Sequence, residues 1–286
     1  MKSIFKIIII FFGISSYAQE LIFENLFDSS LGSEIACYRI PSIISSINGT
    51  LIAAIDERNN SWGDLKWNRD INIVLRKSYD DGNTWTEIEK IIDYPDGESA
   101  SDPSMILDKQ TGHIFMFYNY MNLDKAKDVY RLMLIKSSDN GKSWSNPKDI
   151  TSQITKESWE KDFMFITSGR GTQTKDGTLL HCLVNLNKGT HVFGSNDHGE
   201  NWFLIDSPLN PADESKIVEL SNGDWLVNSR VNSNKFRYSH LSKDKGKSWF
   251  SFENKDLLDP ACNASLINYN AGSKNLLLFS KITRKK

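Results

Sequence analysis

Short apolar runs recur along the chain, and polar turns rich in Gly, Asp and Asn separate them. Examples are GTLIAAI from Gly49, INIVLRK from Ile71, GHIFMFY from Gly112 and GTLLHCLV from Gly177. Short runs that are rich in β-branched and aromatic residues and bounded by turn residues predict strands rather than helices. The pattern therefore predicts an all-β protein.

One turn motif occurs four times, and we call it the Asp box. It has the form Ser-x-Asp-x-Gly-x-x-Trp and occurs as SYDDGNTW (78–85), SSDNGKSW (137–144), SNDHGENW (195–202) and SKDKGKSW (242–249). In each box we expect the Asp carboxylate to accept backbone N–H bonds, the Gly to adopt a positive φ and the Trp to pack beneath the hairpin. Four copies indicate a repeated structural unit.

The Asp boxes occupy the same place in a longer repeat. Three strand-like runs precede each box and a fourth run follows it. The first runs are YRIPSIIS from Tyr38, DPSMILD from Asp102, GRGTQTK from Gly169 and ESKIVEL from Glu214. Three strands, a boxed turn and a fourth strand are the make-up of a β-propeller blade.

A fifth repeat begins near the end of the chain. NASLIN (263–268) matches a first strand and GSKNLLLFS (272–280) matches a second. The sequence therefore predicts an incomplete propeller of about four blades plus part of a fifth. An open ring exposes strand edges and inner faces, so we expect poor stability and a tendency to aggregate.

The antiparallel order of strands in a blade decides which residues can meet. First-strand starts, second-strand ends and second-to-third loops share one face of the disc, and the Asp boxes lie on the other face. The ionisable residues at the shared positions are Arg39, Asp102, Arg170 and Glu214 at first-strand starts, Arg58 and Arg230 at second-strand ends, and Asp64 in the first loop. We expect these side chains to converge on one face around the axis.

The composition excludes one class of function and gives no sign of bound metals. The 34 Lys and Arg residues are offset by 36 Asp and Glu residues, for a net charge of −2, whereas nucleic-acid binding needs a surplus of basic residues. The three widely spaced cysteines indicate buried free thiols rather than a disulfide framework. The five histidines lie singly, so we expect no metal site and no cofactor.

The N-terminus has the pattern of a signal peptide. Two Lys residues within 1–6 precede an apolar run at 7–14, and Ser16-Tyr17-Ala18 offers small residues for cleavage after Ala18. The apolar run is too short to span a bilayer, so we expect no membrane span once residues 1–18 are removed. Residues 19–286 are expected to form one propeller domain that is exported to the periplasm or secreted.

Several motifs together resemble a known family. Tyr38-Arg39-Ile40-Pro41, followed by Asp56-Glu57-Arg58 and the four Asp boxes, resembles the bacterial exo-α-sialidases, which are glycoside hydrolases with a six-bladed propeller. Ser168-Gly169-Arg170-Gly171 is similar to the PGRG segment of that family, with Ser in place of Pro. Asp213-Glu214-Ser215, with Arg230 sixteen residues after Glu214, is a further match. The resemblance covers residues 35–280.

The resemblance implies which residues bind the sugar. Arg39 and Arg230 match two members of the arginine triad that clamps the carboxylate of sialic acid, and a guanidinium fork suits a carboxylate geometrically. Arg58 and Asp102 match positions that contact the sugar in relatives. Trp62 and Trp67 would either shield the sugar or pack on the rim.

The resemblance also implies the catalytic groups. Asp64 matches the general acid that protonates the leaving oxygen, with Asp70 of the same loop as the alternative. The family uses a neutral Tyr as nucleophile because the substrate is itself an anion, and a Glu accepts the phenol proton. Glu214 matches that base, although a solvated loop carboxylate is the other interpretation of this residue.

The chain departs from the family pattern after Arg230. The third arginine of the triad and the nucleophilic Tyr belong to a C-terminal portion, whereas this chain offers only Arg237, Arg284, Tyr238 and Tyr269, none in the family's context. The resemblance implies a retaining exo-α-sialidase that acts on sialylated glycans such as glycoproteins, gangliosides and oligosaccharides. We expect this chain to be weakly active or inactive. The alternative is a non-catalytic propeller module that binds glycans or partner proteins.

Overall fold

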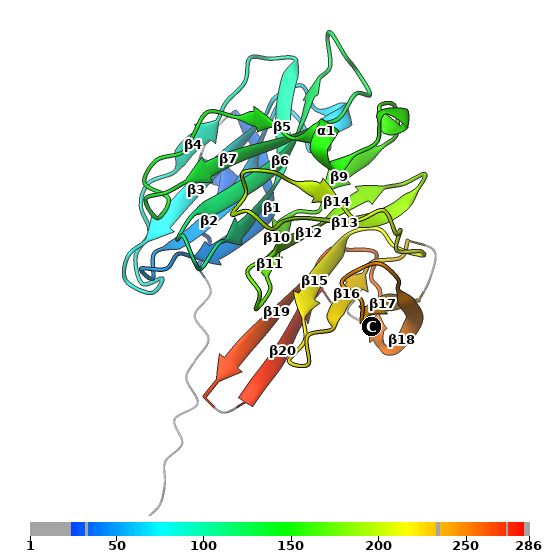
Figure 1. Ribbon diagram of the computed structural model, residues 1–286. Helices are drawn as coiled ribbons and strands as arrows, with labels where there is room; N and C mark the ends of the chain where they lie inside the picture. The colour runs from blue at the N-terminus through cyan, green and yellow to red at the C-terminus, as the bar shows by residue number, and fades with distance from the viewer. Residues whose placement is uncertain (1–23, 32–33, 233–234, 273, 283–286) are drawn as a thin grey trace, which may run out of the picture.

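The computed structural model describes residues 24–31, 34–232, 235–272 and 274–282, so the predicted signal peptide at 1–18 lies outside the described residues. Almost all regular structure in the described part is β-strand, arranged as successive sheets (Figure 1). The prediction of an all-β fold is confirmed. No helix in the described ranges is long and apolar enough to cross a membrane.

The first two blades follow the predicted order from inner to outer strand. The first contains β1 (Ile35–Ser45), β2 (Leu51–Asn59), β3 (Ile71–Ser78) and β4 (Glu89–Ile92). The second contains β5 (Glu98–Leu107), β6 (Ile114–Asn122), β7 (Arg131–Ser137) and β8 (Lys148–Asp149). Within each blade, every strand pairs antiparallel with the next.

The later part of the chain repeats this plan twice and begins it once more. The third blade contains β9 (Met164–Ile166), β11 (Thr172–Gln173), β12 (Leu179–Asn185), β13 (Gly189–Ser195) and β14 (Phe203–Leu204). The fourth contains β15 (Ser215–Glu219), β16 (Trp225–Ser229), β17 (Phe236–Ser242) and β18 (Phe250–Leu258). A two-stranded sheet of β19 (Ala264–Ala271) and β20 (Lys274–Lys281) follows. The described residues thus form four blades and the first two strands of a fifth.

The inner strand of the third blade differs from the prediction. The run GRGTQTK is broken, because β10 (Gly169–Arg170) pairs in parallel with β5 of the second blade, whereas β9 and β11 pair with β12. Gly169 has a φ of 101°, and a Cβ on Gly171 would lie 2.4 Å from the Leu180 carbonyl oxygen. The two glycines therefore let the chain cross between blades at close range.

Short helical turns lie before β1 and in some of the connections between strands. They are η1 (Ser29–Leu31), η2 (Leu65–Trp67), η3 (Glu157–Trp159) and α1 (Thr151–Ile154). Of these, η2 lies in the loop between β2 and β3, where the sequence predicts the acidic residue of the site. The three cysteines are free, as expected; Cys37 and Cys182 are buried and Cys262 is partly exposed.

The Asp boxes have the predicted hydrogen bonds. In the first box, Asp80 Oδ1 accepts from the Thr84 amide at 2.8 Å and Asp80 Oδ2 accepts from the Thr84 hydroxyl at 2.6 Å, while the Gly82 amide donates to Ser78 Oγ at 2.8 Å. The box glycine has a positive φ in all four copies, and so has the residue before it. The box tryptophans are buried or partly buried. The structural interpretation of the boxes is confirmed.

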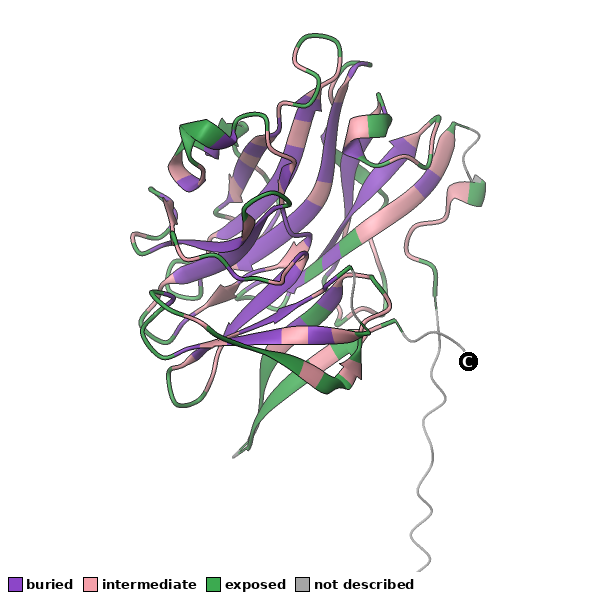
Figure 2. Cartoon of the chain, turned by 90° about the vertical axis from the view of Figure 1, so that its right-hand side faces the viewer, coloured by how far each residue is buried: buried purple, intermediate pink, exposed green. Residues whose placement is uncertain are grey.

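Three of the boxes pack against the blade that precedes them. A Cβ added to Gly141, Gly199 or Gly246 would lie 2.3, 2.3 and 3.1 Å from side-chain atoms of Ile52, Phe115 and Ile205, respectively. Trp202 of the third box packs edge-on against Phe117 of β6. The middle strands of the first three blades, β2, β3, β6, β7, β12 and β13, are buried along most of their length, whereas β18, β19 and β20 are largely exposed (Figure 2). The boxes thus join neighbouring blades.

Candidate active site

A cavity of about 1350 Å³ lies among the inner strands β1, β5, β10, β15 and β19. Five of the six residues predicted to bind or react line it, and they are Arg39, Asp64, Asp102, Glu214 and Arg230. Arg170, which the sequence also places at a first-strand start, is part of the wall. The structure therefore brings together residues that are up to 191 positions apart, between Arg39 and Arg230, on one cavity.

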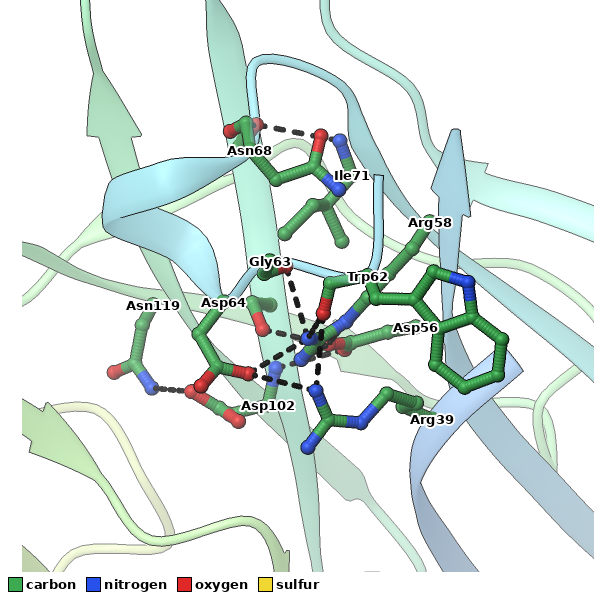
Figure 3. A network of polar contacts seen from close by, with 12 residues as sticks. Arg39, Asp56, Arg58, Trp62, Gly63, Asp64, Asn68, Ile71, Asp102 and Asn119 are labelled. Atoms are coloured by element: carbon green, nitrogen blue, oxygen red, sulfur yellow. Dashed lines mark hydrogen bonds and ion pairs between the residues drawn. The ribbon is translucent and has the colours of Figure 1, made fainter. Parts of the chain in front are cut away.

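Arg58 is the predicted residue that does not reach the cavity. Its side chain has no exposed surface. The guanidinium instead contacts Asp64 Oδ1 at 2.6 Å through Nη1 and Asp56 Oδ2 at 2.9 Å through Nη2 (Figure 3). In this structure Arg58 fixes the acidic loop, and the prediction that it contacts the sugar stays a prediction.

The loop between β2 and β3 presents Asp64 to the cavity. Asp64 directly precedes η2 with extended backbone angles, and its side chain is 58% exposed. Nη1 of Arg39 donates to Asp64 Oδ1 at 3.3 Å and to the Trp62 carbonyl at 3.1 Å (Figure 3). Asp70, the alternative acid, is not among the cavity-lining residues of the described chain. The geometry therefore favours Asp64.

The aromatic residues of this loop are both exposed. Trp67 lines the cavity and lies beside Phe163, with ring centroids 6.5 Å apart. Trp62 contributes its carbonyl group to Arg39 and Arg58, while its indole is 68% exposed. Trp67 is thus the one placed to cover a ligand.

Asp102 sits on a bulge of β5. The register of β5 against β6 shifts between Ser101 and Ser104, and Asp102 has a φ of 64°. Asn119 Nδ2 donates to Asp102 Oδ2 at 3.0 Å, and Asn119 is itself held by the backbone of Ile166. A bulge redirects a side chain, which here aims the carboxyl group into the cavity. Burial, together with the nearby charge of Asp56, raises the pKa of Asp102, and a carboxyl group that keeps its proton can donate to a sugar hydroxyl.

Glu214 and Arg230 lie opposite each other where β15 begins and β16 ends. The Arg230 amide donates to the Glu214 carbonyl at 2.9 Å, so the hairpin places the two side chains together. Arg230 Nη1 then donates to Glu214 Oε2 at 2.6 Å, and Arg230 Nε donates to Asn232 Oδ1 at 2.7 Å. Burial opposes the charge of Arg230, but the bond to Glu214 outweighs it and raises the pKa of Arg230.

Two cavity residues add positive charge that the sequence assigns to no role. Arg170 has no hydrogen-bond or ion-pair partner among the described residues, and burial lowers its pKa. Lys216 of β15 donates to the Ser168 carbonyl at 2.7 Å and to Asn263 Oδ1 at 2.8 Å, and burial lowers its pKa to about 8. Lys216 was missed because its partners lie in other repeats, so no local motif marks it.

The tyrosines that line the described part of the cavity do not contact Glu214. They are Tyr38 and Tyr130. Burial and the neighbouring Glu57, which accepts from the Tyr38 hydroxyl at 3.3 Å, raise the pKa of Tyr38 to about 12. Burial also raises the pKa of Tyr130. Both shifts disfavour the phenolate form of these side chains. The described residues also contain no group of three or more His, Cys, Asp or Glu side chains placed to hold a metal ion.

Comparison with known proteins agrees with this arrangement. The BNR repeat-like domain family matches residues 49–286. A sialidase of Bacteroides fragilis is 30% identical over 275 residues, covering 86% of this chain and 50% of the relative. A sialidase of Micromonospora viridifaciens is 32% identical over 277 residues, covering 85% of this chain and 41% of the relative. This chain therefore spans about half the length of the curated relatives it matches.

A solved structure shows the same fold. The Hadza microbial sialidase Hz136 superposes with a TM-score of 0.75 at 29% identity, covering 86% of this chain and 53% of that one. The sheets described above are thus those of a sialidase-type propeller. Because the domain match covers most of the sequence and the sialidase relatives align along it, the chain belongs to the BNR repeat-like domain family and, within it, to the bacterial sialidases with BNR repeats.

Proposed function

We propose that the protein acts as a retaining exo-α-sialidase, a glycoside hydrolase that releases terminal sialic acid from glycoproteins, gangliosides and oligosaccharides. One observation carries this proposal. Arg39 and Arg230, from the first and fourth blades, line the same cavity as the carboxyl groups of Asp64 and Glu214. A site with cationic forks and separate carboxyl groups suits an anionic sugar that must be held by its charge while a glycosidic bond breaks.

Each group has a distinct task in this reaction. Arg39 and Arg230 bind the sugar carboxylate, and Asp102 contacts a sugar hydroxyl. Asp64, on its exposed loop, donates a proton to the glycosidic oxygen as the bond to the anomeric carbon breaks. Glu214 accepts the proton of the group that attacks that carbon, which is a Tyr in the family by the resemblance described above.

The test is hydrolysis of a fluorogenic aryl sialoside by the purified chain. The proposal is supported if the unmutated chain releases the fluorophore and both Arg39→Ala and Glu214→Gln abolish that release. If the chain neither hydrolyses the sialoside nor binds 3′-sialyllactose in calorimetry, the proposal is wrong.

The second candidate is a module that binds glycans without cleaving them. The observation that favours it is that Tyr38 and Tyr130 have raised phenol pKa values and do not contact Glu214. Binding of sialyllactose that depends on Arg39, without any hydrolysis, would support this candidate over the enzyme.

We also propose that the protein is exported to the periplasm or the medium and has no nucleic-acid partner and no membrane span once processed. The support is the pattern of residues 1–18 and the balanced charge of the chain. Sialylated glycans lie outside bacterial cells, so an exported protein can reach them.

A further inference from the structure

Asp56 is a buried carboxylate of β2 to which the resemblance gives no role. Its side chain has no exposed surface, so it cannot touch a substrate in the cavity. Its two oxygens nevertheless contact groups that hold both acidic residues of the site (Figure 3). Oδ2 accepts from Arg58, which in turn holds Asp64, and Oδ1 accepts from the Asp102 amide. Burial raises the pKa of Asp56 to about 6, although Arg58 and Ser101 stabilise its charged form.

One oxygen of Asp56 fixes the loop that carries Asp64. Asp56 Oδ2 accepts from Arg58 Nε at 3.2 Å and from Arg58 Nη2 at 2.9 Å. Nη1 of the same guanidinium then donates to Asp64 Oδ1 at 2.6 Å and to the Gly63 carbonyl at 2.9 Å. A planar guanidinium held along one edge can present its other edge in only one direction. The position of Asp64 therefore depends on Asp56.

Asp56 also holds the bulge that carries Asp102, and it does so through both of its oxygens. Asp56 Oδ1 accepts from the Asp102 amide at 2.9 Å, and Ser101 Oγ donates to Asp56 Oδ2 at 2.6 Å. The amide belongs to a residue with a φ of 64°, which a non-glycine residue keeps only where its surroundings hold it. The contact crosses from the first blade to the second, so it also sets the two blades relative to each other at the site.

We propose that Asp56 is a positioning residue that aligns the general acid Asp64, through Arg58, with the sugar-contacting Asp102. This inference rests on the proposed sialidase function for the identity of the acid. It predicts that the proton donation step, rather than folding alone, depends on a carboxylate that never meets the substrate.

A buried ion pair also stabilises a fold, so the test must separate the two roles. Asp56→Asn preserves shape but removes the charge that holds Arg58. Asp108→Asn is the matched control, because the Asp108 side chain is equally unexposed but lies at the turn between β5 and β6, where it accepts from the Gln110 amide at 2.9 Å and contacts His198 of an Asp box. Both variants lose a buried carboxylate, but only Asp56→Asn loses one that is linked to Asp64 through Arg58.

The first readout compares two substrates that differ in their need for an acid. In an aryl sialoside with an acidic phenol, the phenolate can leave without being protonated. In sialyllactose, the leaving oxygen of the lactose needs a proton. We expect Asp56→Asn to lower kcat on sialyllactose at least 10-fold more than kcat on the aryl sialoside, and Asp108→Asn to affect both alike. An equal loss on both substrates in Asp56→Asn would show a purely structural role and overturn the proposal.

The second readout does not need activity. Hydrogen exchange of the backbone amides of residues 60–67 should become faster in Asp56→Asn and stay unchanged in Asp108→Asn, because only the first releases Arg58 from its anchor. Unchanged exchange in this loop would overturn the proposal even if both variants fold. If the unmutated chain hydrolyses neither sialoside, the proposed function has failed instead, and the exchange measurement alone decides whether Asp56 holds the loop.

Discussion

Asp64 contacts two arginines, and the two contacts differ greatly in strength. Its contact with Arg39 is 3.3 Å long and joins side chains that are 40% and 58% exposed, and such pairs contribute about 0–1 kcal/mol. Its contact with Arg58 is 2.6 Å long and involves a buried guanidinium. Under the proposed function, a sugar carboxylate would displace Asp64 from Arg39 at little cost while Arg58 still held Asp64 in place.

If the proposed function is right, Arg39 should dominate recognition of the sugar carboxylate. A charge-assisted bidentate contact contributes about 1.5–3 kcal/mol, so we expect Arg39→Ala to weaken sialyllactose binding by about 10- to 100-fold in calorimetry. Arg69→Ala is the control, since Arg69 is an exposed arginine that pairs with Asp96 and Asp124 and does not line the cavity. An unchanged affinity in Arg39→Ala would contradict the assignment.

Most residues that sequence motifs mark line the cavity, with Arg58 as the exception, and residues that act through other repeats were missed. Arg39, Asp64, Glu214 and Arg230 were predictable because each follows from a local motif and a strand position. Asn119 was not, because its value lies in contacts with Asp102 and with Ile166, which is 47 residues away. The burial of Arg58 could not be predicted from the sequence either, because it depends on how the loop of Trp62 and Gly63 folds over the guanidinium.

At the scale of the element, the Asp box is a turn in which the Asp carboxylate, rather than a backbone carbonyl, accepts hydrogen bonds from the turn. Asp139 accepts from the Ser143 amide at 2.9 Å and from the Ser143 hydroxyl at 2.6 Å. The strand runs and box geometry followed from the sequence, because local turn chemistry decides them. The broken inner strand of the third blade did not, because the pairing of Gly169 with Ser104 joins two blades.

The boxes should make the stability of the protein depend on acid pH. The hydroxyl and amide of Ser143 lower the pKa of Asp139 to about 2, below its value of about 4 in an unfolded chain. This carboxylate therefore adds stability above about pH 4, and the contribution is lost as the pH falls towards 2. Urea unfolding between pH 5 and pH 2 should show a shallower fall in the free energy of unfolding for Asp139→Asn. An identical slope would contradict this account.

The packing of a box on the preceding blade can be tested at its glycine. In Gly199→Ala the new Cβ would lie 2.3 Å from the buried ring of Phe115, at a φ of 82°. We expect a loss of about 2–5 kcal/mol in urea unfolding, from overpacking and from the left-handed backbone together. Gly49→Ala is the control, because its φ is 88° but nothing lies within 4 Å, so about 1–2 kcal/mol is expected. Equal losses would rule out the contact with Phe115.

At the scale of the whole molecule, circular repetition builds the site. The inner strands β1, β5 and β10 bring Arg39, Asp102 and Arg170 to the cavity, and the fourth blade brings Glu214, directly before β15, and Lys216 within it. The convergence of Arg39, Asp102 and Glu214 was predictable from the repeat because the same strand position returns in their blades, whereas Arg170 lies on β10, which pairs with the second blade. The depth of the cavity and the buried link from Asp56 to Asp64 were not, because they depend on packing between blades.

Export can be tested on the protein from its native host. We expect the mature N-terminus to begin at Gln19, because cleavage after Ala18 fits the small-residue pattern there. Edman degradation or terminal-peptide mass spectrometry of periplasmic and medium fractions would show this. Recovery only from the cytoplasm, with Met1 intact, would contradict the prediction.

The packing of the second, third and fourth boxes on the preceding blade gives the molecule a direction of assembly. The second, third and fourth boxes rest on Ile52, Phe115 and Ile205, which are all earlier in the chain than the boxes that use them. A ribosome makes the supporting side chain before the turn that needs it, and domains fold from the N-terminus as they emerge. Each blade can therefore settle on a finished neighbour during synthesis, without waiting for residues still to be translated.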